Sequence, residues 1–241
     1  MGKLYIGTQE VTPFFYDKEE SAGITREVDA NGKYGYPAQN FSFSLPSSAT
    51  DIGSFALDAS FPNCTSLTSI DFSSLTTVSG LQALYGAFSA CHALTSASFP
   101  SLTVVSGDTA FSVAFSSCAS LASVDFSALT TVSGSQAFYN AFRNCHSLTS
   151  ADFSSLTTLS SSNALSGAFQ GCTSLTSIDF SSLTTASAQS VLNGAFQGCT
   201  SLTSMSFPAL ADVSGKYALS RAFENCSSLT SLSFPALTTS S

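Results

Sequence analysis

Cysteine recurs at a fixed interval along most of this chain. Each of the seven cysteines follows the previous one by 27 residues, at Cys64, Cys91, Cys118, Cys145, Cys172, Cys199 and Cys226. A strict period of this length is typical of a solenoid, in which one supersecondary unit stacks on copies of itself. Because a solenoid has no single global core, the length of 241 residues sets the number of coils rather than the number of domains.

Several other positions keep the same register. If each cysteine is position 1 of a unit, positions 4 and 12 are Leu and position 9 is Phe in all seven units. Position 25 is Phe in the six units that reach it. Each side chain is therefore predicted to stack on its own copy in the next coil. The two rows of Phe are expected to form a buried structural spine rather than a platform for a ligand.

One unit predicts a strand, a turn and a short helix. Residues 67–72 have apolar side chains in the L-x-x-L-x-L spacing of a leucine-rich repeat, which predicts a short strand over the last three of them. Leu75 and Val78 continue the inward-facing set, and Ser79-Gly80 then marks a break. Residues 83–91 have apolar residues at i, i+1, i+4, i+5 and i+8, which predicts a helix of two to three turns.

We therefore expect an α/β fold, a leucine-rich repeat solenoid built from 27-residue strand–turn–short helix units. Strands stack about 4.8 Å apart, whereas helices pack about 8–10 Å apart. This mismatch predicts a shallow horseshoe with the strands on its concave side.

The chain is predicted to have two parts. Residues 1–36 form a non-repeat segment rich in charge, which we expect to anchor or cap the solenoid. Its opening KLYIGTQEVTPFFY predicts two short strands around a turn at Gly7-Thr8. Residues 37–241 are predicted to form the solenoid, with a degenerate capping unit at 37–63 and seven units at 64–241, the last of them incomplete.

The repeat resembles a known family. The pattern F-x-x-C-x-S-L-T-S-I-x-F-P-x-L-T-x-V is similar to the BspA-like class of bacterial leucine-rich repeats, over about residues 37–241 and seven times over. Two departures stand out: the family's usual repeat is a few residues shorter, and Gly is replaced at Ser161 and Ala188. Members of the family are typically surface-exposed proteins of host-associated bacteria, similar to adhesins, and some are encoded by phages. The resemblance implies a binding role and names no partner.

The concave strand face is the candidate binding surface, because positions 6, 8 and 10 point outward there. Position 6 is always Ser, and position 8 is Asp or Ser. Three consecutive units have Asp at position 8, and we call these residues the acidic stripe: Asp125, Asp152 and Asp179. At a spacing of about 5 Å their carboxylates are expected to repel one another and to raise one another's pKa. The predicted ligand-binding residues are Ser69, Asp71, Ser123, Asp125, Ser150, Asp152, Ser177 and Asp179.

Other chemistry is weakly indicated. His92 and His146 are expected to be solvated. The sequence contains no recognisable catalytic arrangement and no phosphate-binding loop, so we expect no enzyme activity and no cofactor. The single cysteine per coil predicts a ladder of buried thiols rather than disulfides or zinc. A Ca²⁺ ion shared by the acidic stripe is disfavoured, since calcium takes 6–8 oxygen ligands and Ser is a poor supplement to the carboxylates. A net charge of −8 disfavours nucleic acid.

These features predict a non-catalytic surface recognition or adhesion module, displayed on a bacterial cell surface and binding a protein or glycan. The alternative is a phage virion structural or receptor-binding protein, docked through its N-terminal segment. The sequence shows neither a signal peptide nor an apolar run long enough to insert into a membrane. Two further hypotheses follow from the repeat: its Thr-Thr pairs form an array that an ice-binding protein could use, and the uncovered C-terminal end supports a homo-oligomer or larger assembly.

Overall fold

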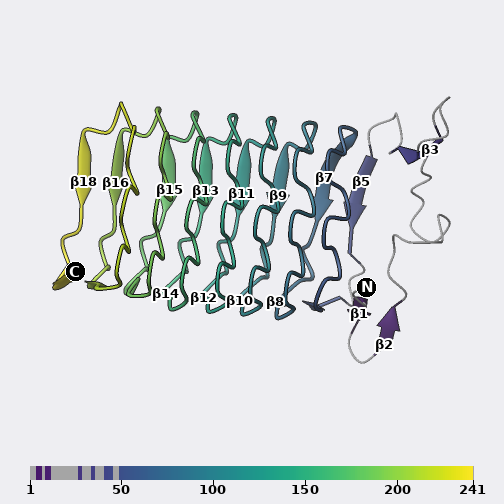
Figure 1. Ribbon diagram of the computed structural model, residues 1–241, viewed down its shortest axis with the longest axis horizontal. Helices are drawn as coiled ribbons and strands as arrows, with labels where there is room; N and C mark the ends of the chain where they lie inside the picture. Colours follow the sequence, from purple (N-terminus) through teal and green to yellow (C-terminus); the bar gives the residue numbers. More distant parts are fainter. Residues whose placement is uncertain are drawn as a thin grey trace.

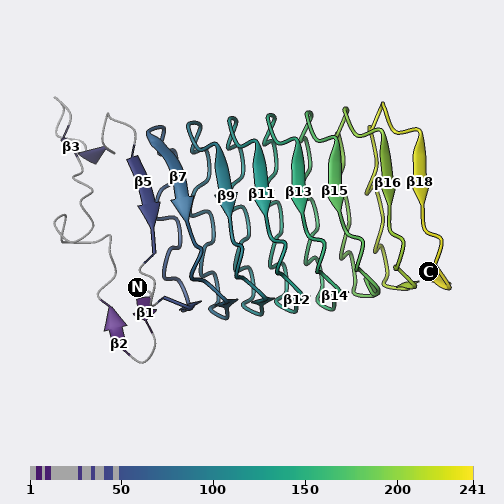
Figure 2. The same cartoon turned by 180° about the vertical axis from the view of Figure 1, so that it is seen from behind.

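The computed structural model describes residues 4–6, 9–11, 27–28, 34–35, 41–45 and 49–240. From residue 49 onward the chain winds into coils that lie side by side in a nearly straight row, as Figure 1 and the opposite view in Figure 2 show. The strands follow in this order: β1 (Leu4–Ile6), β2 (Gln9–Val11), β3 (Glu27–Val28), β4 (Tyr34–Gly35), β5 (Phe41–Ser44), β6 (Asp51–Ile52), β7 (Leu67–Asp71), β8 (Thr77–Val78), β9 (Ser96–Ser98), β10 (Val104–Val105), β11 (Ser123–Asp125), β12 (Thr131–Val132), β13 (Ser150–Asp152), β14 (Thr158–Leu159), β15 (Ser177–Asp179), β16 (Ser204–Ser206), β17 (Asp212–Val213), β18 (Ser231–Ser233) and β19 (Thr239–Ser240).

Two parallel sheets run along the solenoid. The main sheet has the order β5-β7-β9-β11-β13-β15, and β16 and β18 pair further along the same side. The second sheet has the order β6-β8-β10-β12-β14, after which single bridges at Thr185 and the pair β17–β19 continue it. Residues pair with their own copies 27 positions away, as Ser123 does with Ser150. The predicted parallel stacking in strict register is confirmed.

The predicted helices are wrong. Residues 49–240 contain no helix, and positions 18 to 27 of each unit form a run of consecutive turns instead. We call this run the turn segment. In it, positions 22, 24 and 26 donate their N–H three residues back within the coil, as Ala87 does to Leu84 at 3.1 Å. Odd-numbered positions donate to the next coil, as Phe88 does to Ala114 at 2.8 Å.

Left-handed residues make this alternation possible. Positions 19, 23 and 27 have positive φ in each of coils 1 to 6, for example 52° at Thr109, 49° at Val113 and 62° at Ser117. A left-handed residue therefore follows every three residues with right-handed or extended backbone. It changes the direction of the chain each time, so no helical turn can propagate. Gly and Asn tolerate this conformation best, and they occupy positions 23 and 27 in several coils, as at Asn140, Gly167 and Gly171.

The absence of helices also corrects the expected horseshoe. Backbone hydrogen bonds join neighbouring coils through the main sheet, the second sheet and the turn segment alike. All sides of a coil therefore share one strand-like spacing of about 4.8 Å, and the mismatch that would bend the stack does not arise. Glycine at position 17 allows equally close approach, since a Cβ built on Gly107 would lie 2.7 Å from the carbonyl carbon of Gly80.

The interior consists of the predicted ladders. At position 9, Phe126 stacks on Phe153 with ring centroids 5.1 Å apart, and at position 25, Phe115 stacks on Phe142 at 5.5 Å. The two ladders meet edge to face, with Phe126 and Phe142 6.1 Å apart at 66°. These rings are fully buried. The prediction of a phenylalanine spine is confirmed.

The N-terminal segment contributes two antiparallel pairs, β1 with β2 and β3 with β4. β1 lies beside β6, which is the first strand of the second sheet. The expected turn at Gly7-Thr8 lies outside the described residues. The domain boundaries predicted at 36–37 and 63–64 stay predictions.

Candidate binding surface

The outer face of the main sheet carries two rows of small polar side chains. In β7, β9, β11, β13, β15 and β16 the residue at position 7 lies in the core or packs against it, as the buried Val124 does, so its neighbours at positions 6 and 8 point outward. The parallel register aligns the rows from coil to coil. All eight predicted ligand-binding residues lie on this face and are exposed or half-buried: Ser69, Asp71, Ser123, Asp125, Ser150, Asp152, Ser177 and Asp179.

The register joins six of these residues into one continuous patch. Asp125 pairs with Asp152, and Asp152 pairs with Asp179, which places the acidic stripe on three neighbouring strands. The other two, Ser69 and Asp71, lie on β7 and are separated from this patch by β9. β9 contributes Ser98 at position 8, and its hydroxyl donates to Oδ2 of Asp125 at 3.2 Å. The predicted set does not contain Ser98, because its unit has Ser rather than Asp at position 8.

Backbone hydrogen bonds fix the orientation of the aspartates. In each D-F-S unit, Oδ1 accepts the N–H of the serine two residues later, at 2.8 to 3.0 Å. In the described part of the chain, Oδ2 of Asp152 and Oδ2 of Asp179 have no partner. One oxygen of each carboxylate is thus held by the fold, and the second remains available as an acceptor at the surface.

The pKa of Asp125 departs from its ordinary value in the direction opposite to our expectation. Burial raises the pKa, but hydrogen bonds from the Ser127 backbone, the Ser127 side chain and the Ser98 side chain together lower it below the usual value. The hydrogen bonds from Ser73 likewise lower the pKa of Asp71. Donors close to the carboxylate favour its charged form more than a parallel carboxylate one strand away disfavours it. Asp125 and Asp71 are therefore anionic at neutral pH.

Among the residues that the structure describes, no group of three His, Cys, Asp or Glu side chains is placed to hold a metal ion. His146 is exposed, and its Nδ1 lies 3.1 Å from the carbonyl oxygen of Gly171 at the end of the same unit. His92 is also exposed. With the helices absent, neither histidine lies at a helix end.

The threonine rows have a structural role. At position 13 the hydroxyl donates to the carbonyl of the same position in the preceding coil, as from Thr130 to Thr103 at 3.0 Å. The same carbonyl also accepts the backbone N–H of Thr130 at 2.9 Å. Position 5 repeats the arrangement, as from Thr176 to Thr149 at 3.1 Å. These hydroxyl protons are used inside the protein, which weighs against the ice-binding hypothesis.

The cysteines form the predicted ladder of buried thiols. All seven are free and buried. Six of them donate Sγ–H to the carbonyl oxygen of the position 25 Phe two turn segments back, as from Cys145 to Phe115 at 3.1 Å. Burial raises the pKa of Cys145 far above its usual range and the pKa of Cys199 to about 12. Such thiols are poor nucleophiles and poor metal ligands at neutral pH.

The turn segment gives the molecule a second, more varied surface. Tyr85, Tyr139 and Leu81 are about two-fifths exposed there. On the turn segments of later coils, Gln197 donates to Glu224 at 2.7 Å, and Gln170 donates to Gln197 in turn. These side chains differ from coil to coil, whereas those of the main sheet repeat.

Comparisons with known proteins agree on one type of repeat. The family model of the BspA type leucine rich repeat region matches residues 34–162 and 139–241, in six copies. A comparison with curated proteins gave no match. Within the described residues, no helix is long and apolar enough to cross a membrane.

Three solved structures are similar to the chain. A leucine-rich repeat protein of T. pallidum has 22% identity and a TM-score of 0.46, over 75% of this chain and 77% of that one. One from Eubacterium ventriosum has 20% identity and a TM-score of 0.41, over 81% of this chain and 55% of its own. A leucine rich cell surface protein of Faecalibacterium prausnitzii has 16% identity and a TM-score of 0.25, over 93% of this chain and 96% of that one.

Proposed function

Because the chain belongs to the family of BspA-type leucine-rich repeats, we propose that it is a non-catalytic recognition module whose main sheet binds a macromolecular partner. The proposal includes display outside the cell, on a bacterial surface, and a role in adhesion. A rigid solenoid suits this role, because its repeated units form one long surface with little conformational entropy left to lose on binding.

The observation that carries the proposal is the fixed orientation of the acidic stripe. Asp125, Asp152 and Asp179 stand in register on neighbouring strands, each with Oδ1 held by a backbone N–H. An ionised carboxylate can only accept hydrogen bonds, so the complementary partner must supply donors. Lys or Arg side chains of a protein partner are the favoured donors, since charged donors make the stronger bonds.

The overall charge supports a basic partner. The chain has a net charge of −8, so a positively charged segment is attracted from a distance and neutral or acidic ones are not. Attraction of this kind weakens as salt is added, because the Debye length falls to about 8 Å at physiological ionic strength. The expected binding is therefore salt-dependent, and a neutral glycan would not show this dependence.

The experiment measures binding of synthetic lysine-containing peptides and, separately, of a neutral glycan array to the 241-residue protein. The variant Asp125→Asn/Asp152→Asn/Asp179→Asn keeps side-chain shape and removes the charges. Asp212→Asn is the matched control: Asp212 also holds the N–H two residues later, at 2.9 Å, but lies in the second sheet. We expect peptide binding to weaken at least tenfold in the triple variant and to be unchanged in the control.

Two results would contradict the proposal. Equal peptide binding by the triple variant and the control would remove the acidic stripe from the recognition surface. Salt-independent binding of a neutral glycan, unaffected by either variant, would make the partner a glycan recognised elsewhere. Surface display is tested separately, by antibody labelling of intact cells before and after protease treatment. The alternative of a phage virion protein stays a prediction, since no observation here bears on it.

A further inference from the structure

Tyrosine recurs at one outward position of the turn segment. Position 22 is Tyr85 in the first coil and Tyr139 in the third, and each is 38% exposed. In the second coil, between them, the same position is Ser112, which is 3% exposed. Backbone hydrogen bonds hold the three coils side by side, from Gly86 to Ser112 and from Val113 to Tyr139, both at 2.9 Å. A small, buried side chain therefore lies between two large, exposed ones, which we call the tyrosine pair.

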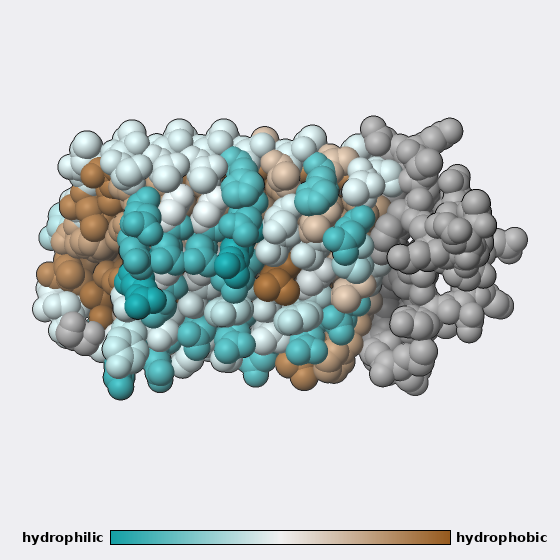
Figure 3. Space-filling view, turned by 45° about the horizontal axis from the view of Figure 1, so that its top comes forward, coloured by the Kyte–Doolittle hydropathy of each residue, from teal (hydrophilic) through white to brown (hydrophobic). Residues whose placement is uncertain are grey.

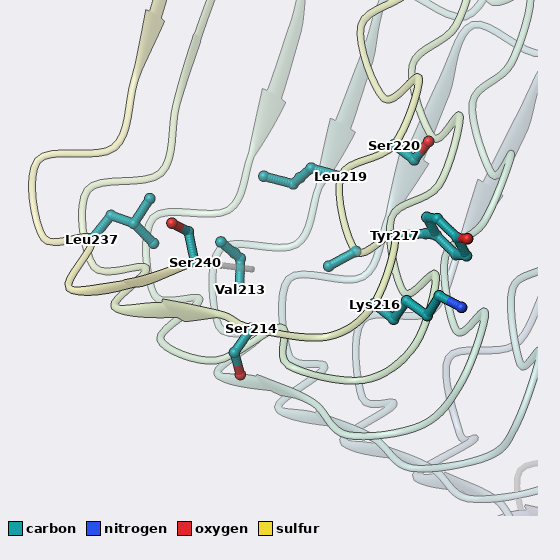
Figure 4. A pocket seen from close by; sticks show the side chains of 9 residues that line it. Val213, Ser214, Lys216, Tyr217, Leu219, Ser220, Leu237 and Ser240 are labelled. Carbon is teal, nitrogen blue, oxygen red and sulfur yellow. The ribbon is translucent and has the colours of Figure 1, made fainter.

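The spacing of the tyrosine pair suits a cation. Coils with strand-like spacing stack about 4.8 Å apart, so the same position two coils away is separated by about 10 Å. A group midway between the two side chains then lies about 5 Å from each, within the roughly 6 Å over which a cation is attracted to the face of an aromatic ring. The chain already forms one contact of this kind, because Nζ of Lys216 lies 4.8 Å from the centroid of the Tyr217 ring. Figure 4 shows both of these side chains.

Carboxylates border the tyrosine pair. Asp58 occupies position 22 in the coil before Tyr85, and Asp108 occupies position 18 of the middle coil. Both are exposed, and Oδ1 of Asp108 is fixed by the N–H of Ser135 at 2.7 Å. Arg143, four residues after the second tyrosine, contributes one positive charge. Two carboxylates against one guanidinium leave a negative surrounding, in a chain with a net charge of −8, and this surrounding attracts cations.

The space between the rings has an apolar border. A Cβ built on Gly86 would lie 3.8 Å from Cγ2 of Val113, which places a valine methyl beside the turn that carries Tyr85. Val113 has a φ of 49°, and strain of this kind in a β-branched residue is often kept at functional sites. Apart from the C-terminal end, the brown surface in Figure 3 lies over the coils nearer the N-terminus, and the coils between carry mostly teal and pale side chains.

We propose that the tyrosine pair binds a quaternary ammonium group, such as the one in choline. The cation lies between Tyr85 and Tyr139 and above Ser112, with the carboxylate of Asp108 at one end and the methyl of Val113 beside it. A primary ammonium has three N–H donors that need acceptors, whereas a quaternary ammonium has none and its methyl groups match ring faces and a valine. The site shares no residue with the acidic stripe, so this inference does not depend on the proposed function.

The experiment follows the methyl signal of choline by NMR as the 241-residue protein is added, since an aromatic ring shifts the signal of a group that lies over it. At an exposed site we expect millimolar affinity, and Tyr85→Ala and Tyr139→Ala should each weaken binding about two- to fivefold. Tyr85→Phe keeps the ring and should bind as the unaltered protein does. Tyr217→Ala is the matched control, because Tyr217 is exposed on a turn segment but its ring already holds Lys216. Asp108→Asn should also weaken binding, while its Oδ1 still accepts the same N–H.

Further probes separate charge from shape and identify the source of the group. Dimethylbutanol, the neutral isostere of choline with carbon in place of nitrogen, and ethanolamine, which keeps the charge without the methyl groups, should both bind more weakly than choline. Cosedimentation with phosphatidylcholine vesicles shows whether the site also takes the group from a lipid, and either source supports the inference.

Three outcomes would overturn the inference. An unshifted choline signal at every concentration would show that the tyrosine pair holds no cation. Equal binding of dimethylbutanol would make the contact merely apolar. Loss of binding in Tyr217→Ala, with none in the variants of Tyr85 and Tyr139, would place the site elsewhere.

Discussion

Phe153 shows what the interior demands of a single residue. Its ring stacks between Phe126 at 5.1 Å and Phe180 at 5.4 Å, and it meets Phe169 edge to face at 6.0 Å. It is fully buried. Because every coil repeats this arrangement, the ring cannot shift without displacing its copies.

We predict that Phe153→Ala lowers the free energy of unfolding by roughly 3–5 kcal/mol, since it empties a site that its neighbours cannot fill. Phe234→Ala should lower it by clearly less, because Phe234 is half-buried and, among the residues that the structure describes, stacks on Phe207 alone. Urea denaturation of the two variants makes the comparison. Equal losses, both below about 1 kcal/mol, would contradict the stacked ladder.

The thiol ladder makes stability depend on pH on the alkaline side. Burial raises the pKa of Cys199 in the folded protein from an ordinary value of 9.0 to about 12. The folded state therefore holds the proton over a range in which the unfolded state releases it. This contribution to stability is complete below pH 9 and is lost as the pH rises from 9 toward 12.

We predict that the unfolding free energy falls steadily above pH 9, by up to about 1.4 kcal/mol per pH unit for each buried thiol. Cys199→Ala should have a shallower fall than the unaltered protein, by about one thiol's share. Tyrosine ionisation is common to both proteins and cancels in the difference. Identical slopes between pH 9 and 12 would show that this thiol is not protected by burial.

At the scale of the element, the turn segment explains why the helix was predicted and why it is absent. Its buried positions are 20, 21, 24 and 25, as in Ala110, Phe111, Ala114 and Phe115. An amphipathic helix produces the same spacing, so apolar periodicity alone cannot separate the two structures. The distinguishing signal is the recurrence of Gly and Asn at positions 23 and 27. These residues lower helix propensity and tolerate positive φ.

Val113 is the residue least suited to its place in this element. It is β-branched, yet its φ is 49°. We predict that Val113→Gly stabilises the protein by about 1 kcal/mol, because it removes strain of that order. Val104→Gly is the matched control: Val104 is half-buried as well, but lies in β10 with extended backbone, and this variant should destabilise. Thermal melts that show Val113→Gly to be the more damaging change would contradict the left-handed turns.

At the scale of the whole molecule, the features that repeat in every coil could be predicted best, because the repeat keeps a strict register. The parallel stacking, the phenylalanine spine and the outward rows on the main sheet all follow from side-chain alternation and the 27-residue period. The curvature of the stack depends on the coil-to-coil spacing on the strand side and on the turn-segment side. It could not be predicted once a helix was assumed on the second of these. The hydrogen bonds that lower the pKa of Asp125 were also missed, since they come from Ser98 and Ser127, which look like ordinary surface serines.

The central claim is that backbone hydrogen bonds join each coil to the next on every side, including the side where a helix was predicted. Scalar couplings measured by NMR across hydrogen bonds identify the carbonyl to which each N–H donates. The structure predicts a coupling from the N–H of Phe88 to the carbonyl of Ala114, and likewise from Phe115 to Ala141. A helix would instead couple Phe88 to Leu84, four residues back. The first result is the one we expect, and the second would contradict the account.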